Sequence, residues 1–367
     1  MQQLDLSSMK RRVAVIGATG MVGQRFVTLL ARHPWFELCA VAASARSAGK
    51  TYQEAVQGRW AMQEPIPQAA RNLVVLDAAD TAAVCEGVDF CFCAVDMPRA
   101  AVRELEDACA RLETPVVSNN SAHRGTPDVP MIIPELNPEH AGVIEHQRRR
   151  LGTRVGFVTV KPNCSIQSYV PALHALMPLR PQRAVVSTYQ AISGAGKTFE
   201  RWPEMLDNVI PYISGEEEKS EQEPLKIWGR MQDGVIVPAT QPVISAQCVR
   251  VAASDGHLAT VWLTLGEKAT PEDLIARWRA YRGLPQQLGL PSAPDPFISY
   301  FDEPDRPQTR LDRDAGHGMG ITLGRLRADS LFDFRFVGLS HNTLRGAAGG
   351  GVLIAELLVA QGYIPRK

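Results

Sequence analysis

The chain has 367 residues, of which 45% are hydrophobic and 21% charged, a composition typical of a folded globular protein. Its 39 basic residues balance its 39 acidic ones, so bulk charge favours neither a nucleic acid nor an anionic membrane as a partner. Because one hydrophobic core does not ordinarily extend over this length, we expect two domains. Residues 1–10 lack a signal-peptide pattern and no apolar run is long enough to span a membrane, which predicts a cytoplasmic protein.

The seven cysteines form no pattern that indicates a structural role. They are odd in number and lack CxxC spacing, which argues against a disulfide framework and against a zinc site. We therefore expect no bound metal. Cys91 and Cys93 lie two residues apart in a strand-like run, so their side chains should share one face and pack in the core.

The first motif is a predicted strand followed by a glycine-rich turn. Residues 13–16 are continuously apolar, as in a strand that is covered on both faces. Gly17, Gly20 and Gly23 follow, and residues 24–32 have the periodicity of a helix. This spacing is a variant of the dinucleotide fingerprint, in which glycines let the backbone approach a pyrophosphate at a helix N-terminus.

The second predicted strand, residues 37–43, should end where an adenosine ribose would bind. NAD-specific sites have an acidic residue there, whereas this chain has Ser44, Arg46 and Ser47. Hydroxyl groups and an arginine suit a 2′-phosphate, so we infer NADP(H) rather than NAD. A solvated basic loop is the alternative interpretation.

Further strands are predicted at residues 73–76, 90–95 and 115–118, separated by helical or turn-rich sequence. Alternating strands and helices predict an α/β fold with a parallel, doubly wound sheet. Arg124 lies in the polar loop after the last of these strands, at the end of the sheet where such folds bind ligands. It is a candidate anion contact, with an ordinary surface arginine as the alternative.

Cys164 lies between a predicted buried strand, residues 155–160, and a predicted helix, residues 166–179. Pro162 keeps Lys161 out of the helical region and so ends the strand. The unpaired N–H groups at the start of the helix should lower the pKa of the Cys164 thiol and make it reactive. An inert buried cysteine is the alternative.

A second glycine-rich turn, residues 193–197, follows a predicted strand at residues 184–191. It is either another close backbone approach to a ligand, near a nicotinamide, or an ordinary β-turn. An acidic helix start follows at Glu216, and Lys219 lies one turn further on the same face. These two side chains either bind an amine and a neighbouring anion or form a solvated helix end.

The next candidates lie on a predicted strand pair, residues 248–251 and 257–263. Arg250 suits a bidentate bond with a substrate carboxylate. His257, beside a glycine turn, is a candidate acid/base. Residues 352–360 predict a helix rich in small residues, which we expect to return to the first domain.

Seven stretches, in order over nearly the whole chain, together resemble the aspartate-β-semialdehyde dehydrogenase family, particularly its archaeal and fungal branch. They are residues 17–24, 45–50, 162–165, 189–196, 215–219, 250–257 and 342–348. The resemblance implies a Rossmann-type NADP-binding domain over residues 1–161, completed by a C-terminal helix over 345–367. It also implies an α+β catalytic and dimerisation domain with a mixed sheet over 162–344, and a homo-oligomer.

By this resemblance Cys164 is the nucleophile, His257 the acid/base and Gln190 a further catalytic residue. Glu216 would bind the substrate amine, and Glu217 is an adjacent contender for that role.

The resemblance also assigns the binding positions. Arg250 would bind the substrate carboxylate. The family's phosphate contacts are matched by Arg124, Asn163 and Lys219. Its NADP contacts are matched by Thr19, Gly20, Met21, Val22, Ser44, Arg46, Ser47, Gly194 and Asn342.

The implied reaction is the NADPH-dependent reductive dephosphorylation of L-aspartyl 4-phosphate to L-aspartate 4-semialdehyde through a cysteine thioester, on the way to lysine, threonine, methionine and isoleucine. Ile166 and Ala252 replace a threonine and a proline that are common in the family. The alternatives are a malonyl-CoA reductase of the same superfamily and a non-catalytic NADP-binding regulator. Malonyl-CoA has no amine for Glu216 to bind, and a regulator would need no reactive cysteine and histidine.

Overall fold

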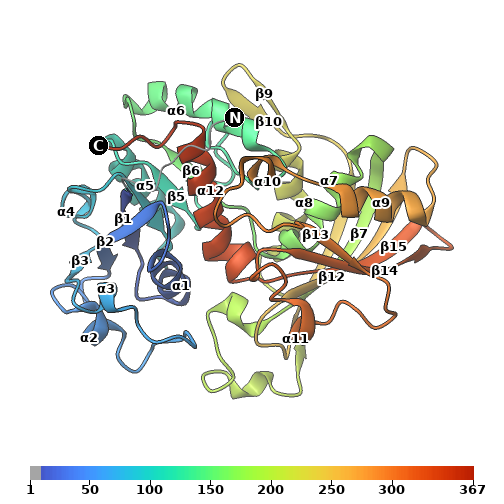
Figure 1. Cartoon of the computed structure of the whole chain (residues 1–367), viewed down its shortest axis with the longest axis horizontal. Helices are drawn as coiled ribbons and strands as arrows, with labels where there is room; N and C mark the ends of the chain where they lie inside the picture. The colour runs from blue at the N-terminus through green and yellow to red at the C-terminus, as the bar shows by residue number, and fades with distance from the viewer. Residues whose placement is uncertain (1–9) are drawn as a thin grey trace.

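The computed structural model describes residues 10–367, which form two large β-sheets and a short two-stranded hairpin (Figure 1). The first sheet has six strands in the order β3-β2-β1-β4-β5-β6, and every neighbouring pair is parallel. Its strands are β1 (Arg11–Ile16), β2 (Phe36–Ala43), β3 (Val75–Asp77), β4 (Phe90–Cys93), β5 (Val116–Ser118) and β6 (Val158–Val160). The predicted doubly wound parallel sheet is confirmed.

Helical segments connect these parallel strands, as parallel neighbours require. They are α1 (Met21–Leu30), α2 (Tyr52–Val56), α3 (Gln68–Arg71), α4 (Thr81–Cys85), α5 (Arg99–Arg111), the 3₁₀ helix η1 (Pro138–Val143) and α6 (Ile144–Leu151). All four residues of β4 are buried, including Cys91 and Cys93, which confirms the prediction that these two thiols are core residues.

The second sheet has seven strands in the order β13-β14-β15-β12-β7-β11-β8 and is mixed. Its strands are β7 (Pro181–Gln190), β8 (Val209–Ile210), β11 (Val243–Val251), β12 (His257–Leu265), β13 (Ile298–Phe301), β14 (Ile321–Ala328) and β15 (Phe334–Ser340). A separate hairpin is formed by β9 (Arg230–Gln232) and β10 (Val235–Val237).

The predicted pairing of residues 248–251 with 257–263 is wrong. Strand β7 lies between β11 and β12, parallel to the first and antiparallel to the second. Periodicity identifies a strand but not its neighbours, because the neighbours are chosen by the packing of the whole sheet. The consequence is chemical: Arg250 lies beside Gln190, and His257 begins the strand on the other side of β7.

The predicted continuous helix over residues 166–179 is also wrong. The chain forms the 3₁₀ helix η2 (Ser165–Ser168), the short helix α7 (Val170–Ala175) and the 3₁₀ helix η3 (Met177–Leu179). Pro171 and Pro178 lack the N–H groups that a continuous helix needs, and Tyr169 leaves the helical region with φ −138°. Cys164 is therefore followed by a single tight turn.

The C-terminal segment joins the two halves (Figure 1). A π-helical turn, η6 (Leu344–Ala348), runs into α12 (Gly349–Ala360), which contacts α1 and β5 of the first half. Eleven of the twelve α12 residues are buried, and its contacts with α1 and β5 are those that the expected return to the nucleotide half requires. The domain boundary at residues 161–162 stays a prediction, and one buried apolar cluster includes strands of both sheets.

The remaining helices are α8 (Glu216–Ile227), α9 (Pro271–Ala280), α10 (Leu284–Leu288), α11 (Thr309–Asp312), and the 3₁₀ helices η4 (Ile192–Ala195) and η5 (Pro203–Met205). Among residues 10–367 no helix is both long and apolar enough to cross a membrane.

Candidate active site

Cys164 occupies the turn between β6 and η2 and is partly exposed. The preceding residue, Asn163, shapes this turn, because its Oδ1 accepts hydrogen bonds from the Ser165 backbone N–H and hydroxyl, both at 2.7 Å. Gly346 of η6 packs against the cysteine: a Cβ atom at this glycine would lie 2.8 Å from the Cβ of Cys164. Two segments from distant parts of the chain thus hold the thiol.

The predicted lowering of the thiol pKa is wrong. Burial, and then the negative charge of Glu216, raise the pKa of Cys164, while Lys161, Arg124 and Arg250 act in the opposite direction. The prediction relied on a helix N-terminus, but a four-residue 3₁₀ turn supplies little dipole. The cations around the sulfur therefore have to favour its thiolate.

Glu216 is the centre of a buried hydrogen-bond network. It accepts both hydrogen bonds of the Asn163 amide at 2.9 and 3.0 Å, one from Gln190 at 3.2 Å, and one from the Lys219 ammonium at 2.9 Å. Burial opposes its ionisation, but Lys219 and these donors lower the pKa of Glu216. The solvated-end interpretation is wrong for Glu216.

Glu217 points elsewhere. Its carboxylate accepts a hydrogen bond from the Cys248 backbone N–H at 3.2 Å, on strand β11. The first turn of α8 thus presents one acid to the site and the next to the sheet, as expected from the angular step between consecutive helical residues.

Arg250 and His257 meet at the second glycine-rich turn. Arg250 donates to the Ala191 carbonyl at 2.8 Å, and the Ala191 N–H donates to His257 Nδ1 at 3.1 Å. A Cβ atom at Gly194 would lie 2.9 Å from the Arg250 guanidinium and 3.0 Å from His257 Nε2. Only glycine fits at this position, because Arg250 and His257 approach its backbone too closely for a side chain. The interpretation of this turn as an ordinary β-turn does not explain that requirement.

His257 is fully buried, and this burial lowers its pKa to about 3. Because Nδ1 accepts a hydrogen bond, the neutral ring carries its proton on Nε2. This Nε2 is buried and has no partner among the described residues. A buried, unpaired donor is costly, so a ligand atom that accepts from it would be bound favourably.

Arg124 lies in the same network and is not an ordinary surface arginine. Its guanidinium donates to the Lys161 carbonyl at 3.0 Å and to Glu223 at 2.9 Å. The other Glu223 oxygen accepts from the Asn163 backbone N–H at 2.6 Å. Arg124, Lys219 and Glu223 also line a cavity of about 510 Å³.

The glycine-rich turn after β1 has the close packing that a nucleotide-binding loop needs. Gly17 has φ +85°, and a Cβ atom there would lie 2.3 Å from the Ala94 carbonyl oxygen after β4. A Cβ atom at Gly23 would lie 2.1 Å from the Gly17 carbonyl oxygen. β1 and β4 are neighbours whose connections run to opposite sides of the sheet, the place where doubly wound folds bind nucleotides.

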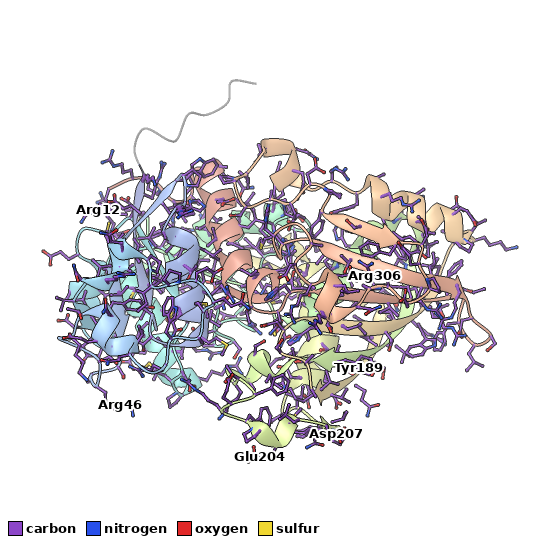
Figure 2. The ribbon with its side chains drawn as sticks, turned by 60° about the horizontal axis from the view of Figure 1, so that its bottom comes forward. Arg12, Arg46, Tyr189, Glu204, Asp207 and Arg306 are labelled. Carbon is purple, nitrogen blue, oxygen red and sulfur yellow. The ribbon has the colours of Figure 1, made fainter. Side chains whose placement is uncertain are left out.

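The predicted 2′-phosphate loop follows β2. Ser44 and Arg46 are exposed, and Figure 2 shows Arg46 at the outer edge of the nucleotide half. The Ser47 side chain is buried, and its hydroxyl accepts a hydrogen bond from Arg59 at 2.9 Å. Arg59 was not singled out from the sequence, although an arginine shortly after a basic loop could have suggested it.

The second glycine-rich turn lies close to the first. Asn342 joins it to the β11–β12 connection, because it donates to the Ser193 hydroxyl at 2.8 Å and accepts from the Gly256 N–H at 2.8 Å. A cavity of about 290 Å³ is lined by Met21, at the start of α1, and by Ser193. A ligand on the fingerprint loop can therefore extend toward Gly194 and His257.

Two family profiles match most of the chain. "Semialdehyde dehydrogenase, NAD binding domain" matches residues 12–144, and "Semialdehyde dehydrogenase, dimerisation domain" matches residues 171–345. The aspartate-semialdehyde dehydrogenase of Archaeoglobus fulgidus is 42% identical over 97% of this chain and 100% of its own. The chain belongs to the aspartate-semialdehyde dehydrogenase family. The enzyme of Aspergillus fumigatus is 43% identical over 97% of this chain and 99% of its own.

Solved structures of the family have the same fold. Aspartate-semialdehyde dehydrogenase from Candida albicans, solved with NADP, superposes with a TM-score of 0.86 at 38% identity and covers 97% of this chain and 100% of its own. The Vibrio cholerae enzyme II superposes with a TM-score of 0.73 at 24% identity, over 96% of this chain and 99% of its own. The predicted resemblance to this family is confirmed.

Two residues that depart from the family's usual pattern lie apart from the polar network. Ile166 is fully buried in the hydrophobic core, and Ala252 is exposed in the β11–β12 connection. Sequence reasoning missed Glu223, which holds both Arg124 and Asn163 and lies on α8 two turns after Glu216. Within residues 10–367, no three His, Cys, Asp or Glu side chains gather as a metal site would require.

Proposed function

We propose that this protein is an NADP-dependent, phosphorylating aspartate-semialdehyde dehydrogenase, which converts L-aspartyl 4-phosphate into L-aspartate 4-semialdehyde and inorganic phosphate. The observation that carries the proposal is the convergence of Cys164, Glu216, Arg250 and His257 at one edge of the mixed sheet. An amine, a carboxylate and an acyl group in one small molecule match the acid, the arginine and the thiol.

The substrate is held at both of its charged ends. Glu216 binds the amine, and Arg250, with its carbonyl contact at Ala191, binds the α-carboxylate. Arg124 and Lys219 line a common cavity and bind the phosphoryl group. Gln190, held against Glu216, orients that carboxylate toward the amine.

Cys164 performs the covalent step. Its thiolate attacks the acyl carbon, the C–O bond to phosphate breaks, and an enzyme thioester remains. The neutral His257 donates a hydrogen bond from Nε2 to the substrate oxygen that becomes negative in each tetrahedral intermediate. When the hemithioacetal collapses, the C=O bond re-forms, the C–S bond breaks and Cys164 leaves as a thiolate. NADPH, when bound, supplies the hydride that reduces the thioester.

The nucleotide site fits such a cofactor. The Gly17 and Gly23 positions have no room for a side chain, so the backbone of residues 18–22 is free to approach a pyrophosphate. Thr19, Gly20, Met21 and Val22 form this approach. Ser44, Arg46 and Ser47 bind the 2′-phosphate, and Gly194 and Asn342 lie at the nicotinamide end.

We also propose that the protein is a cytoplasmic homo-oligomer. Val185 and Val243 lie on the same face of the mixed sheet, and they are 38% and 57% exposed, respectively. A second copy of this chain that packs on this face would remove these two apolar side chains from water.

The decisive experiment is phosphate-dependent reduction of NADP with aspartate semialdehyde. We expect activity in the wild type and in Cys39→Ala, which removes a partly exposed cysteine of β2 far from the site. Cys164→Ala should lose at least about 10³-fold in kcat, because the covalent step cannot occur. Full turnover of Cys164→Ala would contradict the mechanism, and faster reduction of malonyl-CoA would contradict the substrate.

A further inference from the structure

The cations around Cys164 differ in whether a carboxylate neutralises them. Arg124 is paired with Glu223 at 2.9 Å and Lys219 with Glu216 at 2.9 Å. Across residues 10–367, no ion pair involves Arg250 or Lys161, although burial leaves Lys161 only 2% exposed. Arg250 is already assigned to the substrate, so Lys161 is a buried cation whose charge the proposed function does not use.

Lys161 and Cys164 both lie against the C-terminal segment. A Cβ atom at Gly346 would lie 2.8 Å from the cysteine Cβ, and one at Gly350 would lie 3.5 Å from the Cδ and Cε atoms of Lys161. A kink at Ala347, with φ −143° and ψ −108°, separates the two glycines. The lysine stem and the cysteine are thus held by two consecutive turns of one segment.

The Lys161 ammonium also acts on the cysteine turn itself. It donates to the Pro162 carbonyl, the peptide oxygen directly before Asn163. The Lys161 carbonyl in turn accepts from Arg124. The turn is therefore fixed from both sides by positive groups.

The surrounding charges favour coupling between the two groups. Arg124, paired with Glu223, and Arg345, paired with Glu135, are the other charged side chains close to the ammonium. Burial, then Arg124, lower the pKa of Lys161 to about 7, and the cysteine thiolate raises it. The positive charge of Lys161 and the negative charge of the Cys164 thiolate therefore stabilise each other.

We propose that Lys161 is a positioning residue for the nucleophile: its buried ammonium stabilises the Cys164 thiolate and, through the Pro162 carbonyl, fixes the turn that presents it. This inference rests on the proposed role of Cys164. The proton that leaves the thiol is held on the lysine amine, and no other reactant is needed. The cations assigned to the substrate, Arg124, Lys219 and Arg250, are not required for this role.

The test is the pH dependence of Cys164 alkylation by iodoacetamide, followed on the Cys164 peptide by mass spectrometry in the absence of substrate. Lys161→Met keeps an apolar stem and removes the charge. We expect the thiol titration to move up by about one pH unit and alkylation at neutral pH to slow about tenfold. Lys161→Arg should restore most of the rate, and kcat should fall in Lys161→Met with little change in KM for NADP.

Lys226→Met is the matched control. Lys226 is another buried lysine, and its ammonium donates to the carbonyls of Arg124, Thr126 and Val129 at 2.8, 2.7 and 2.9 Å. Its loss should lower the melting temperature but leave the thiol titration in place. An unmoved titration in Lys161→Met, or an equal shift in Lys226→Met, would overturn the inference.

Two further measurements keep the outcome unambiguous. If Lys161→Met does not fold, Lys161→Gln is titrated in the same way, because a polar side chain keeps a partner for the Pro162 carbonyl without the charge. Alkylation needs neither substrate nor turnover, so a failure of the proposed function, seen as an active Cys164→Ala, is distinguishable from a failure of the lysine's role.

Discussion

Glu216 illustrates how neighbouring side chains decide the chemistry of one residue. It is an acid in the first turn of α8, a position that the helix dipole favours even when the side chain is solvated. Here Asn163, Gln190 and Lys219 surround it and keep it ionised despite burial. A buried, ionised acid is suited to binding a substrate ammonium.

Glu216→Gln should therefore weaken substrate binding. The amide keeps the shape of the side chain but loses the charge, so we expect KM for aspartate semialdehyde to rise about 10- to 100-fold, with a smaller effect on kcat. Steady-state kinetics measures this. Glu217→Gln is the control, since Glu217 bonds to the β11 backbone, and a larger KM effect there would reverse the assignment.

His257 makes the stability of the protein depend on pH. Burial lowers its pKa to about 3, whereas the unfolded chain takes up a proton near pH ~6.5. The stabilisation of the folded state by neutral His257 is therefore fully present above pH ~6.5 and is lost as the pH falls toward the folded-state pKa. At about pH 5 the loss amounts to about 2 kcal/mol.

His257→Gln should remove this loss. We expect the difference in unfolding free energy between wild type and variant to shift in favour of the variant by about 2 kcal/mol between neutral pH and about pH 5. Denaturant unfolding at both pH values, at fixed protein concentration, tests it. The exposed His146→Gln serves as the control, and a pH-independent difference for His257→Gln would contradict the burial argument.

At the scale of elements, α1 is fixed to the sheet by two glycines. The Gly23 Cα faces the Gly17 carbonyl so closely that the helix could not approach β1 with any side chain at this position. This contact sets the place of the helix N-terminus, where the proposed pyrophosphate binds.

Gly23→Ala should displace α1 from the loop. We expect the unfolding free energy to fall by about 1–3 kcal/mol and NADP binding to weaken at least tenfold, because the helix start moves. Thermal unfolding and a fluorescence titration with NADP measure the two effects. In Gly20→Ala the new Cβ would lie 3.5 Å from the Gly17 carbonyl oxygen, an ordinary contact, so its melting temperature should stay near that of the wild type.

At the scale of the whole molecule, the mixed sheet has one covered and one open face. Along β11, Ile244, Cys248 and Arg250 are buried, while Val243 and Ser245 alternate with them and are exposed. Val185 of β7 lies between Ser245 of β11 and Trp262 of β12. This open face lies in the segment that the dimerisation profile matches.

Val185→Asp should disrupt the proposed subunit contact. A charge buried in an apolar interface is costly, so we expect a shift toward the monomer and a lower melting temperature. Sedimentation velocity at several concentrations measures the shift. Leu331→Asp, in the exposed turn between β14 and β15, places the same charge at an apolar residue outside this face and should leave the oligomer intact. An oligomer unaffected by Val185→Asp would exclude this face.

The sequence by itself determined the parts of this protein that depend on local spacing. Apolar runs predicted β1, β2 and β4, glycine spacing predicted the nucleotide loop, and the seven ordered stretches predicted the family. Local patterns suffice for these features, because strand period, helix period and tight turns are set by residues close in the chain.

Only the tertiary structure decided which side chains meet in the site and how their pKa values are shifted. β7 separates β11 from β12, so Gln190, Arg250 and His257 share one edge. Glu223 and Lys161 join the site through contacts between residues far apart in the chain. Burial raises the pKa of Cys164, whereas the local sequence predicted that it would be lowered. Burial and long-range charge depend on the folded arrangement, which no spacing along the chain encodes.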